Sequence, residues 1–526
     1  MADKPTPRPR KSVKGKPSVR STQSEAKRAN DARNPEPAPQ QPAPQQPAAS
    51  PSPRKPVSQR RFADQPAASP SPRKPVSQRR SAADTLKGAS TKSLKGLASK
   101  VPLKIVGAVA AVAIVAVGIF GVTTLLAPAD PCAPFSNKLA GIEETTDDNG
   151  IVHGTTASGI NYTVHGRQQA GATEGVVSLA AVGDQLASED ALTTADANAG
   201  TTGDGTYDFA PYYKETGPFI GQHDLKFINQ ETITNEANGW LPAGYPTFNG
   251  PDEMIDVLDQ VGFNLVSFCS NHVYDIWTDG IEATHANFAK YPNILVAGSY
   301  TSEEDRNTVH LIERNGITFA MLAYGYGENG YKNSELPNDY YVTMFDEDTA
   351  KADIARAKEV ADVVIVYMHW GEEYKTQITD TQAKQAQFLA DQNVDLVLGS
   401  HNHVTQPINI YTSESGKNVP VVFGMSDFIS GYGLIDTIMS GVFTCDFVKG
   451  EDSVTIENMK WYPCIEWSDG KTTTVRMIKD MTPEEINANT RVTDCDDDYA
   501  HIQEYYESLD MDVEVVLTNE EEQDKA

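Results

Sequence analysis

From Val176 onward the chain alternates between short apolar runs and stretches with helical periodicity. The helical stretches include 349–360, and the apolar runs have the length and β-branched content of buried strands. Strands that alternate with helices predict βαβ units and a largely parallel sheet. Two later segments, 441–448 and 454–461, have the alternation of antiparallel strands. The clearest apolar runs are Val176–Val182, Leu265–Cys269, Val363–Met368 and Val394–Leu398.

Five of the predicted strands are followed directly by residues of metal-ligand type. In open α/β sheets, ligands bind at the carboxyl ends of the strands. Carboxylate, amide oxygen and imidazole suit Mn, Fe, Zn or Mg ions, and two such ions about 4 Å apart can hold a phosphate ester. One such residue could equally cap a helix, form a turn or be a core histidine, but five strand ends together favour a metal site. The residues are Asp184, Asn229, Glu231, Asn271, His272, His369, Glu373, His401 and His403.

These strand ends form a series of motifs that resembles a known family. The motifs are GD at 183–184, N-x-E at 229–231, SNHxxDxxxxG at 270–280, HWGEEY at 369–374 and GSHNHVTQP at 399–407. The series resembles that of the CapA-like proteins, which are named for poly-γ-glutamate capsule synthesis and are similar to calcineurin-like metallophosphoesterases. The resemblance covers roughly Val176–Ile429. It implies a four-layer αββα sandwich that holds one or two divalent metal ions at its strand ends.

The resemblance also implies roles for individual residues. His272 matches a histidine that contacts phosphate or protonates the leaving group, and Glu373 is implied to face the substrate or to support the ligands. Leu186 stands where the phosphoesterases have the histidine of D-x-H, so one ligand of the first metal is missing. Asp427 replaces the asparagine of the family's S-L-G-N-F stretch and adds an acidic group. The implied metal ligands are Asp184, Glu231, Asn271, His369, His401 and His403.

The N-terminal part differs sharply in composition from the rest. Residues 1–104 carry 23 Lys and Arg against 6 Asp and Glu, whereas the remainder carries 21 against 66. Residues 1–100 are rich in Pro, Ser and Gln and contain QPAASPSPRKPVSQRR twice, which predicts a disordered tail. Ile105–Ala127 has no charge over 23 residues, enough to cross a hydrocarbon core of about 30 Å. Lysines before it and acidic residues after it predict a cytoplasmic N-terminus.

These observations predict a membrane-anchored, extracytoplasmic, metal-dependent hydrolase of a phosphoester or envelope-polymer linkage in capsule, poly-γ-glutamate or cell-envelope polymer synthesis. The alternative is a non-catalytic component of a capsule assembly or export complex with a structural or vestigial metal site. Nucleic acid is not an expected partner, because the basic tail has almost no aromatic residues for base stacking. The expected parts are a tail (1–100), a transmembrane helix (101–127), a spacer (128–175), a CapA-like domain (176–480) and a C-terminal helix with an acidic tail (481–526).

Overall fold

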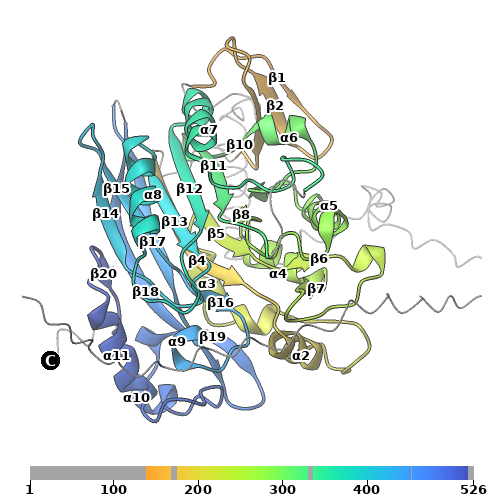
Figure 1. The fold of residues 1–526 in the computed structure, drawn as a ribbon, viewed down its shortest axis with the longest axis vertical. Helices are drawn as coiled ribbons and strands as arrows, with labels where there is room; N and C mark the ends of the chain where they lie inside the picture. The colour runs from red at the N-terminus through yellow and green to blue at the C-terminus, as the bar shows by residue number, and fades with distance from the viewer. Residues whose placement is uncertain (1–137, 168–174, 330–335, 452, 519–526) are drawn as a thin grey trace, which may run out of the picture. The chain divides into compact units, whose positions relative to one another are not determined.

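A computed structural model of the chain describes residues 138–167, 175–329, 336–451 and 453–518. The tail expected over 1–100 and the transmembrane helix expected over 101–127 lie outside these residues. Within the described ranges, no helix is both long and apolar enough to cross a membrane. The described residues confirm the predicted α/β class, and they form two nine-stranded sheets with helices packed against them (Figure 1).

The first sheet has the strand order β1-β2-β3-β10-β11-β12-β13-β15-β14. Its centre, from β11 to β15, is parallel, as predicted. Residues 128–175 were expected to form a spacer, but their described residues contribute strands β1, β2 and β3 to the first sheet. Tyr162 and Val164 of β3 are buried where β3 pairs with β10. The strands are β1 (Glu144–Thr146), β2 (Val152–Thr155), β3 (Asn161–His165), β10 (Val309–Arg314), β11 (Ile317–Gly325), β12 (Val363–His369), β13 (Leu396–Ser400), β14 (Ile408–Thr412) and β15 (Asn418–Val422).

The second sheet has the order β19-β18-β17-β4-β5-β8-β9, with β16 paired to β4 and β20 paired to β18. Its strands β4, β5, β8 and β9 are parallel, whereas β17, β18 and β19 are antiparallel, and the alternation in the sequence predicts this for β17 and β18. The strands are β4 (Val176–Gln185), β5 (Leu225–Gln230), β8 (Leu265–Ser267), β9 (Leu295–Ala297), β16 (Asp427–Ile429), β17 (Met439–Lys449), β18 (Val454–Ser468), β19 (Thr473–Met477) and β20 (Glu514–Val515). A small separate sheet joins β6 (Ile233–Thr234) and β7 (Asn249–Gly250).

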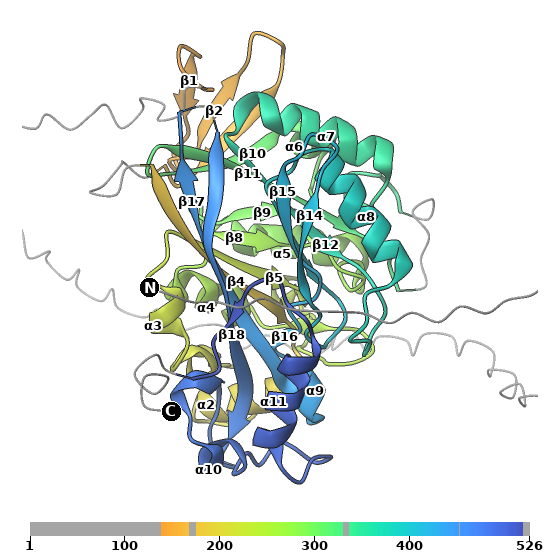
Figure 2. The same cartoon turned by 90° about the vertical axis from the view of Figure 1, so that its left-hand side faces the viewer.

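Helices cover the outer face of each sheet. The helices α7 (Glu347–Val360) and α8 (Asp380–Asp391) lie side by side in Figure 2 and share an apolar core with the first sheet. The helices α2 (Glu189–Asn198) and α4 (Glu253–Val261) share another core with the second sheet. The layers therefore run helix, sheet, sheet, helix. The remaining helices are α3 (Gly217–Ile220), α5 (Trp277–Phe288), α6 (Glu303–Asn307), α9 (Ile435–Ile438), α10 (Pro483–Ile486), α11 (Asp498–Ser508), and the 3₁₀ turns η2 (Ala210–Tyr213), η3 (Glu236–Asn238) and η5 (Ile478–Asp480).

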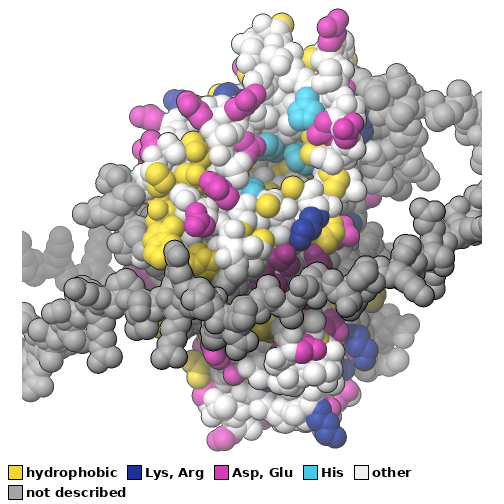
Figure 3. All heavy atoms as spheres, turned by 90° about the vertical axis from the view of Figure 1, so that its right-hand side faces the viewer, with side chains coloured by type: hydrophobic (Ala, Val, Ile, Leu, Met, Phe, Trp, Pro, Cys, Tyr) yellow, Lys and Arg dark blue, Asp and Glu magenta, His cyan; other side chains and the backbone are white. Residues whose placement is uncertain are grey.

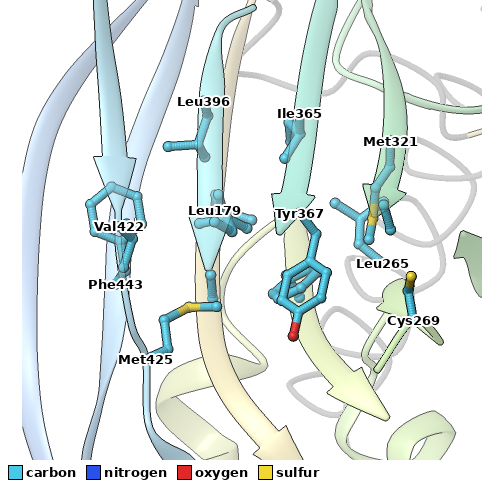
Figure 4. Close-up of a cluster of buried hydrophobic side chains, with 14 of the residues drawn as sticks. Leu179, Leu265, Cys269, Met321, Ile365, Tyr367, Leu396, Val422, Met425 and Phe443 are labelled. Carbon is cyan, nitrogen blue, oxygen red and sulfur yellow. The ribbon is translucent and has the colours of Figure 1, made fainter. Parts of the chain in front are cut away.

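A third core lies between the two sheets and holds them together. In Figure 4, Leu396 and Tyr367 of the first sheet lie near Leu179 of the second sheet, and all three side chains are fully buried. Fully burying a side chain of this size contributes about 1.5–3 kcal/mol. Because β4 and β5 belong to one sheet and β12 and β13 to the other, this packing brings residues after the carboxyl ends of both sheets together.

Candidate metal centre

The structure brings residues from six strand ends to one place. Asp184 lies near the end of β4, and Glu231 follows β5 directly. Asn271 comes after β8, and His369 is the last residue of β12. His401 and His403 follow β13, and Asp427 begins β16. All of these side chains are at least 97% buried, so the site lies inside the domain and not on its surface.

Four of these residues form a compact group. Asp184, Glu231, His403 and Asp427 each offer a ligand atom, and these atoms all lie within 4.8 Å of one another. His403 Nδ1 and Asp427 Oδ1 are 2.8 Å apart. Asn229 supports the group from β5 by donating to Asp184 Oδ1 at 2.8 Å. Three carboxylates and one imidazole at this separation are a donor set suited to a divalent cation.

A second set of predicted ligands adjoins this group through Glu231. His369 Nε2 lies 3.5 Å from Glu231 Oε1 and 2.7 Å from Asn271 Oδ1. The ring of His401 lies 4.8 Å from the ring of His369, centroid to centroid. The hydroxyl of Tyr367 lies 2.9 Å from His369 Nδ1, which orients the imidazole. Glu231 thus lies between two sets of ligand-type side chains, as a shared ligand would.

Local backbone geometry explains how Asp184 and Asp427 meet. A Cβ atom on Gly183 would lie 1.8 Å from the carbonyl oxygen of Ser426, so only glycine lets β4 approach this turn. The Asp184 amide then donates to that same oxygen at 2.9 Å. Ser426 and the two histidines His401 and His403 have positive φ values of 61°, 99° and 54°. Such strained non-glycine residues persist where the surrounding structure holds them, and they cluster at functional sites.

Several polar atoms of the centre have no hydrogen-bond partner among the described residues. They include Glu231 Oε2, Asp427 Oδ2 and His401 Nδ1. No Lys or Arg in the described ranges forms an ion pair with Asp184, Glu231 or Asp427. Burying carboxylates without a counter-charge is unfavourable by several kcal/mol. The residues present therefore fit a divalent cation, which would satisfy the orphaned oxygens and balance the charge.

The same charge imbalance shifts the pKa values of the centre. Burial and then Asp427 raise the pKa of Asp184 to about 6. Burial, followed by Asp184 and Asp427, raises the pKa of Glu231 well above its usual value. Burial and the neighbouring histidines lower the pKa of His401 to about 3. Burial alone lowers the pKa of His403, but Asp427 and Asp184 outweigh it and raise that pKa to about 9.

The two residues expected to act on the substrate lie at the edge of the centre. His272 is 6% exposed, and its Nδ1 lies 2.8 Å from Asp275 Oδ2. The ring of Phe248 packs edge-on against His272 at 4.6 Å. Glu373 is exposed, and its charge acts on Glu231 and His403. Both residues are thus near the ligand group without belonging to it.

Comparisons with known proteins find related sequences over the part of the chain that carries this centre. Residues 178–432 match the family model described as "Bacterial capsule synthesis protein PGA_cap". This part of the chain is similar to the CapA-like family. The "PGA biosynthesis protein CapA" of Bacillus subtilis is 28% identical over 189 residues, which cover 34% of this chain and 46% of that protein. A "Probable polyglutamine synthesis accessory protein" of Mycobacterium tuberculosis is 29% identical over 223 residues, covering 40% and 56%.

The chain thus spans about half the length of the curated CapA-like relatives that it matches. Among solved structures, the NAD nucleotidase of Haemophilus influenzae is 12% identical. It matches with a TM-score of 0.36 over 64% of this chain and 67% of that one.

The structure adds one residue to the ligand set expected for a CapA-like protein. It also shows the position of Leu186, which departs from the phosphoesterase pattern. Asp427 joins the ligand group directly, and the signal for it was the acidic residue in Gly424–Phe428. Leu186 is fully buried, and its amide donates to Ile429 O at 2.8 Å. Tyr326 was also not singled out from the sequence. Its half-exposed ring lies 4.6 Å from the ring of His401 and forms part of the rim of the centre.

Proposed function

We propose that this CapA-like domain is a metal-dependent hydrolase that cleaves a phosphoester or an envelope-polymer linkage during capsule, poly-γ-glutamate or other cell-envelope polymer synthesis. The observation that carries the proposal is the buried group of Asp184, Glu231, His403 and Asp427, whose ligand atoms lie within 4.8 Å of one another. The names of the bacterial relatives support the role in polymer synthesis. One or two divalent ions held there would lower the pKa of a water molecule and stabilise negative charge on the substrate.

The ligand-type residues divide into two sets around Glu231. Asp184, His403 and Asp427 would hold an ion on one side, and Asn271, His369 and His401 would hold an ion on the other. Asp427 also orients His403 by its contact with Nδ1, which leaves His403 Nε2 as the ligand atom. Within the first set, Asp427 would therefore supply a ligand in place of the histidine that is absent at position 186.

His272 is the proposed proton donor to the leaving group. Asp275 Oδ2 accepts from the backbone N–H of Phe248 and also contacts His272 Nδ1 at 2.8 Å, so the imidazole is fixed between two elements. A histidine oriented in this way by a carboxylate can hold a proton at Nε2 and give it to a departing oxygen.

Replacing His272 by Asn is expected to lower kcat about a hundredfold on a generic phosphomonoester or phosphodiester, because general acid catalysis typically contributes that much or more. Metal content, measured by elemental analysis of the full-length protein, should not change. The matched control is His501→Asn, because His501 also contacts a carboxylate, Asp436, at 2.6 Å but comes from α11. Equal activity of the His272→Asn and wild-type proteins would contradict the assigned role.

The second candidate function is a non-catalytic part in polymer assembly or export, and Leu186 favours it. An apolar side chain in place of a ligand histidine is compatible with a metal site that serves structure alone. The same assay distinguishes the two functions. A protein that binds metal but hydrolyses neither class of ester, nor the envelope polymer, would support the structural role.

We also propose that residues 101–127 anchor the protein in a membrane with the CapA-like domain outside the cytoplasm. The supports are the uncharged Ile105–Ala127 stretch and the lysines that precede it. Alkaline phosphatase, which is active only outside the cytoplasm, should be active when fused after Ala526. Activity should disappear when 101–127 is deleted from the same fusion. Full activity of the deletion fusion would overturn this placement.

A further inference from the structure

The exposed aromatic side chains of the described chain lie around the metal centre. Single exposed apolar residues are normal on a protein surface, but a group of them marks a binding site. Five Trp and Tyr side chains are between 40% and 81% exposed, and no other aromatic side chain of the described residues is classed as exposed. We call these five residues the aromatic rim: Trp240, Tyr245, Trp277, Tyr326 and Tyr374.

Three residues of the aromatic rim adjoin His272, the proposed proton donor. The loop between β6 and β7 carries Trp240 and Tyr245, and it lies beside α5, which begins at Trp277 (Figure 1). The ring of Tyr245 lies 6.3 Å from that of Phe248, which in turn packs on His272 at 4.6 Å. The rings of Trp240 and Trp277 are 6.1 Å apart, centroid to centroid.

The other two rim residues pack on histidines of the ligand sets. The ring of Tyr326 lies 4.6 Å from that of His401, and the ring of Tyr374 lies 5.5 Å from that of His403. Both tyrosines are about half exposed, at 52% and 53%. A substrate whose reacting bond lies at the metal centre would therefore place its neighbouring groups against the aromatic rim.

The inclination of the rings indicates which groups fit. Trp240 is inclined to Trp277 by 64°, and Tyr245 is inclined to Phe248 by 69°. Rings at such angles offer separate faces and do not form a slot for one flat base. The C–H bonds of a sugar ring carry a slight positive charge, so they are attracted to the negative face of an aromatic ring. Separate aromatic faces thus suit successive sugar rings of a chain.

The charges beside these rings exclude a polyanion. In the segments that carry the aromatic rim, 236–246, 272–279, 326–329 and 371–375, Lys375 is the only basic residue apart from His272. Carboxylates accept hydrogen bonds from sugar hydroxyl groups but repel an anionic polymer. The six acidic residues of these segments are Glu236, Asp275, Asp279, Glu328, Glu372 and Glu373.

We infer that the aromatic rim binds uncharged sugar residues of the substrate. The inference rests on the proposed function, because the rim is assigned to the substrate that the metal centre would cleave. It narrows that substrate to an ester carried by a neutral glycan. Binding of the sugar itself does not require hydrolysis, so the two can be tested separately.

Isothermal titration of the full-length protein with neutral trisaccharides of glucose, mannose and N-acetylglucosamine measures this binding. At least one trisaccharide should bind, and the Trp240→Ser/Tyr245→Ser variant should bind it about tenfold more weakly, since each ring contact contributes about threefold. Trp240→Phe/Tyr245→Phe keeps both rings and should bind within about twofold of the wild type. The matched control, Tyr411→Ser/Trp467→Ser, removes a Tyr of β14 and a Trp of β18 and should leave binding unchanged.

Thermal unfolding of each variant shows whether the fold is retained. If the serine double variant unfolds, Tyr374→Ser, on a separate segment, should weaken binding about threefold. Sugar binding with this pattern but without hydrolysis of any ester would support the rim and contradict the proposed function. Ester hydrolysis without binding of any of the three trisaccharides would overturn the inference alone, as would tighter binding of adenosine or of a glutamate decamer than of every trisaccharide.

Discussion

The Glu231→Gln protein should bind divalent metal at least about a hundredfold more weakly than the wild type and should unfold at a higher temperature when no metal is present. Loss of residues that merely support a ligand costs ten- to a hundredfold in affinity, and Glu231 touches both ligand sets. Isothermal titration with Mn²⁺ and Zn²⁺, together with thermal unfolding in chelator and in excess metal, measures both effects.

Without metal, the Glu231→Gln variant is expected to be more stable than the wild type because its folding requires no proton at this position. Burial raises the pKa of Glu231 well above its usual value, so folding of the metal-free chain is coupled to proton uptake at pH values above the pKa of the unfolded side chain. That uptake is unfavourable, and it becomes more so as the pH rises above about 5. A glutamine needs no proton, so the advantage of the variant grows over the same range. With saturating metal the order reverses, because binding adds about 2.7 kcal/mol to the wild type at a hundred times Kd.

Two further variants are compared with the Glu231→Gln protein. Glu313→Gln is the matched control, since Glu313 is equally buried but pairs with Arg167. Its loss removes one of the two carboxylates that pair with the buried Arg167 and should lower stability with and without metal. Asp427→Asn should weaken metal binding only about tenfold, because an amide oxygen can still accept from His403. A metal-free Glu231→Gln protein less stable than the wild type would contradict the account of the centre.

The strands that carry the candidate metal centre were predictable because they are buried on both faces. Val363–Met368 was predicted and β12 covers Val363–His369, since a parallel strand covered on both sides is a continuous apolar run. Strand β3 was not predicted, because only Tyr162 and Val164 are apolar among polar neighbours. The division of the strands between two sheets came only from the family resemblance, because local periodicity does not say which strands pair.

A residue of the candidate metal centre could be predicted where it follows a strand that its own sequence identifies. Glu231 follows β5 directly and His369 is the last residue of β12, and the rule that strand ends meet at one edge then brings them together. Asp427 was not placed in the ligand set, because β16 has three residues and exists through its pairing with β4.

The stability of the protein should fall as the pH decreases from 6.5 to 4, and two histidines far from the motif series should cause much of the fall. His165 and His285 line a cavity of about 200 Å³ beside α5 and α6. Histidine side chains are visible together on the face shown in Figure 3. Burial, together with the neighbouring His310, lowers the pKa values of both histidines from 6.5 to about 4.

Between these values the unfolded chain takes up protons at both histidines and the folded chain does not. A lowered folded pKa therefore destabilises the fold progressively as the pH falls through this window, and the loss is complete below about 4. The shift corresponds to roughly 3 kcal/mol for each histidine. Asp305 faces the same cavity, but its pKa lies below the ordinary 3.8, so it stays charged throughout.

Urea denaturation at a series of pH values between 6.5 and 4 measures this effect. The His165→Asn/His285→Asn variant cannot take up these protons, so its free energy of unfolding should fall by several kcal/mol less than that of the wild type. His501→Asn should follow the wild-type curve. Comparing the variant with the wild type under the same conditions cancels the contribution of the titrating metal ligands. Parallel curves for the double variant and the wild type would show that unfolding is not coupled to proton uptake by the two histidines.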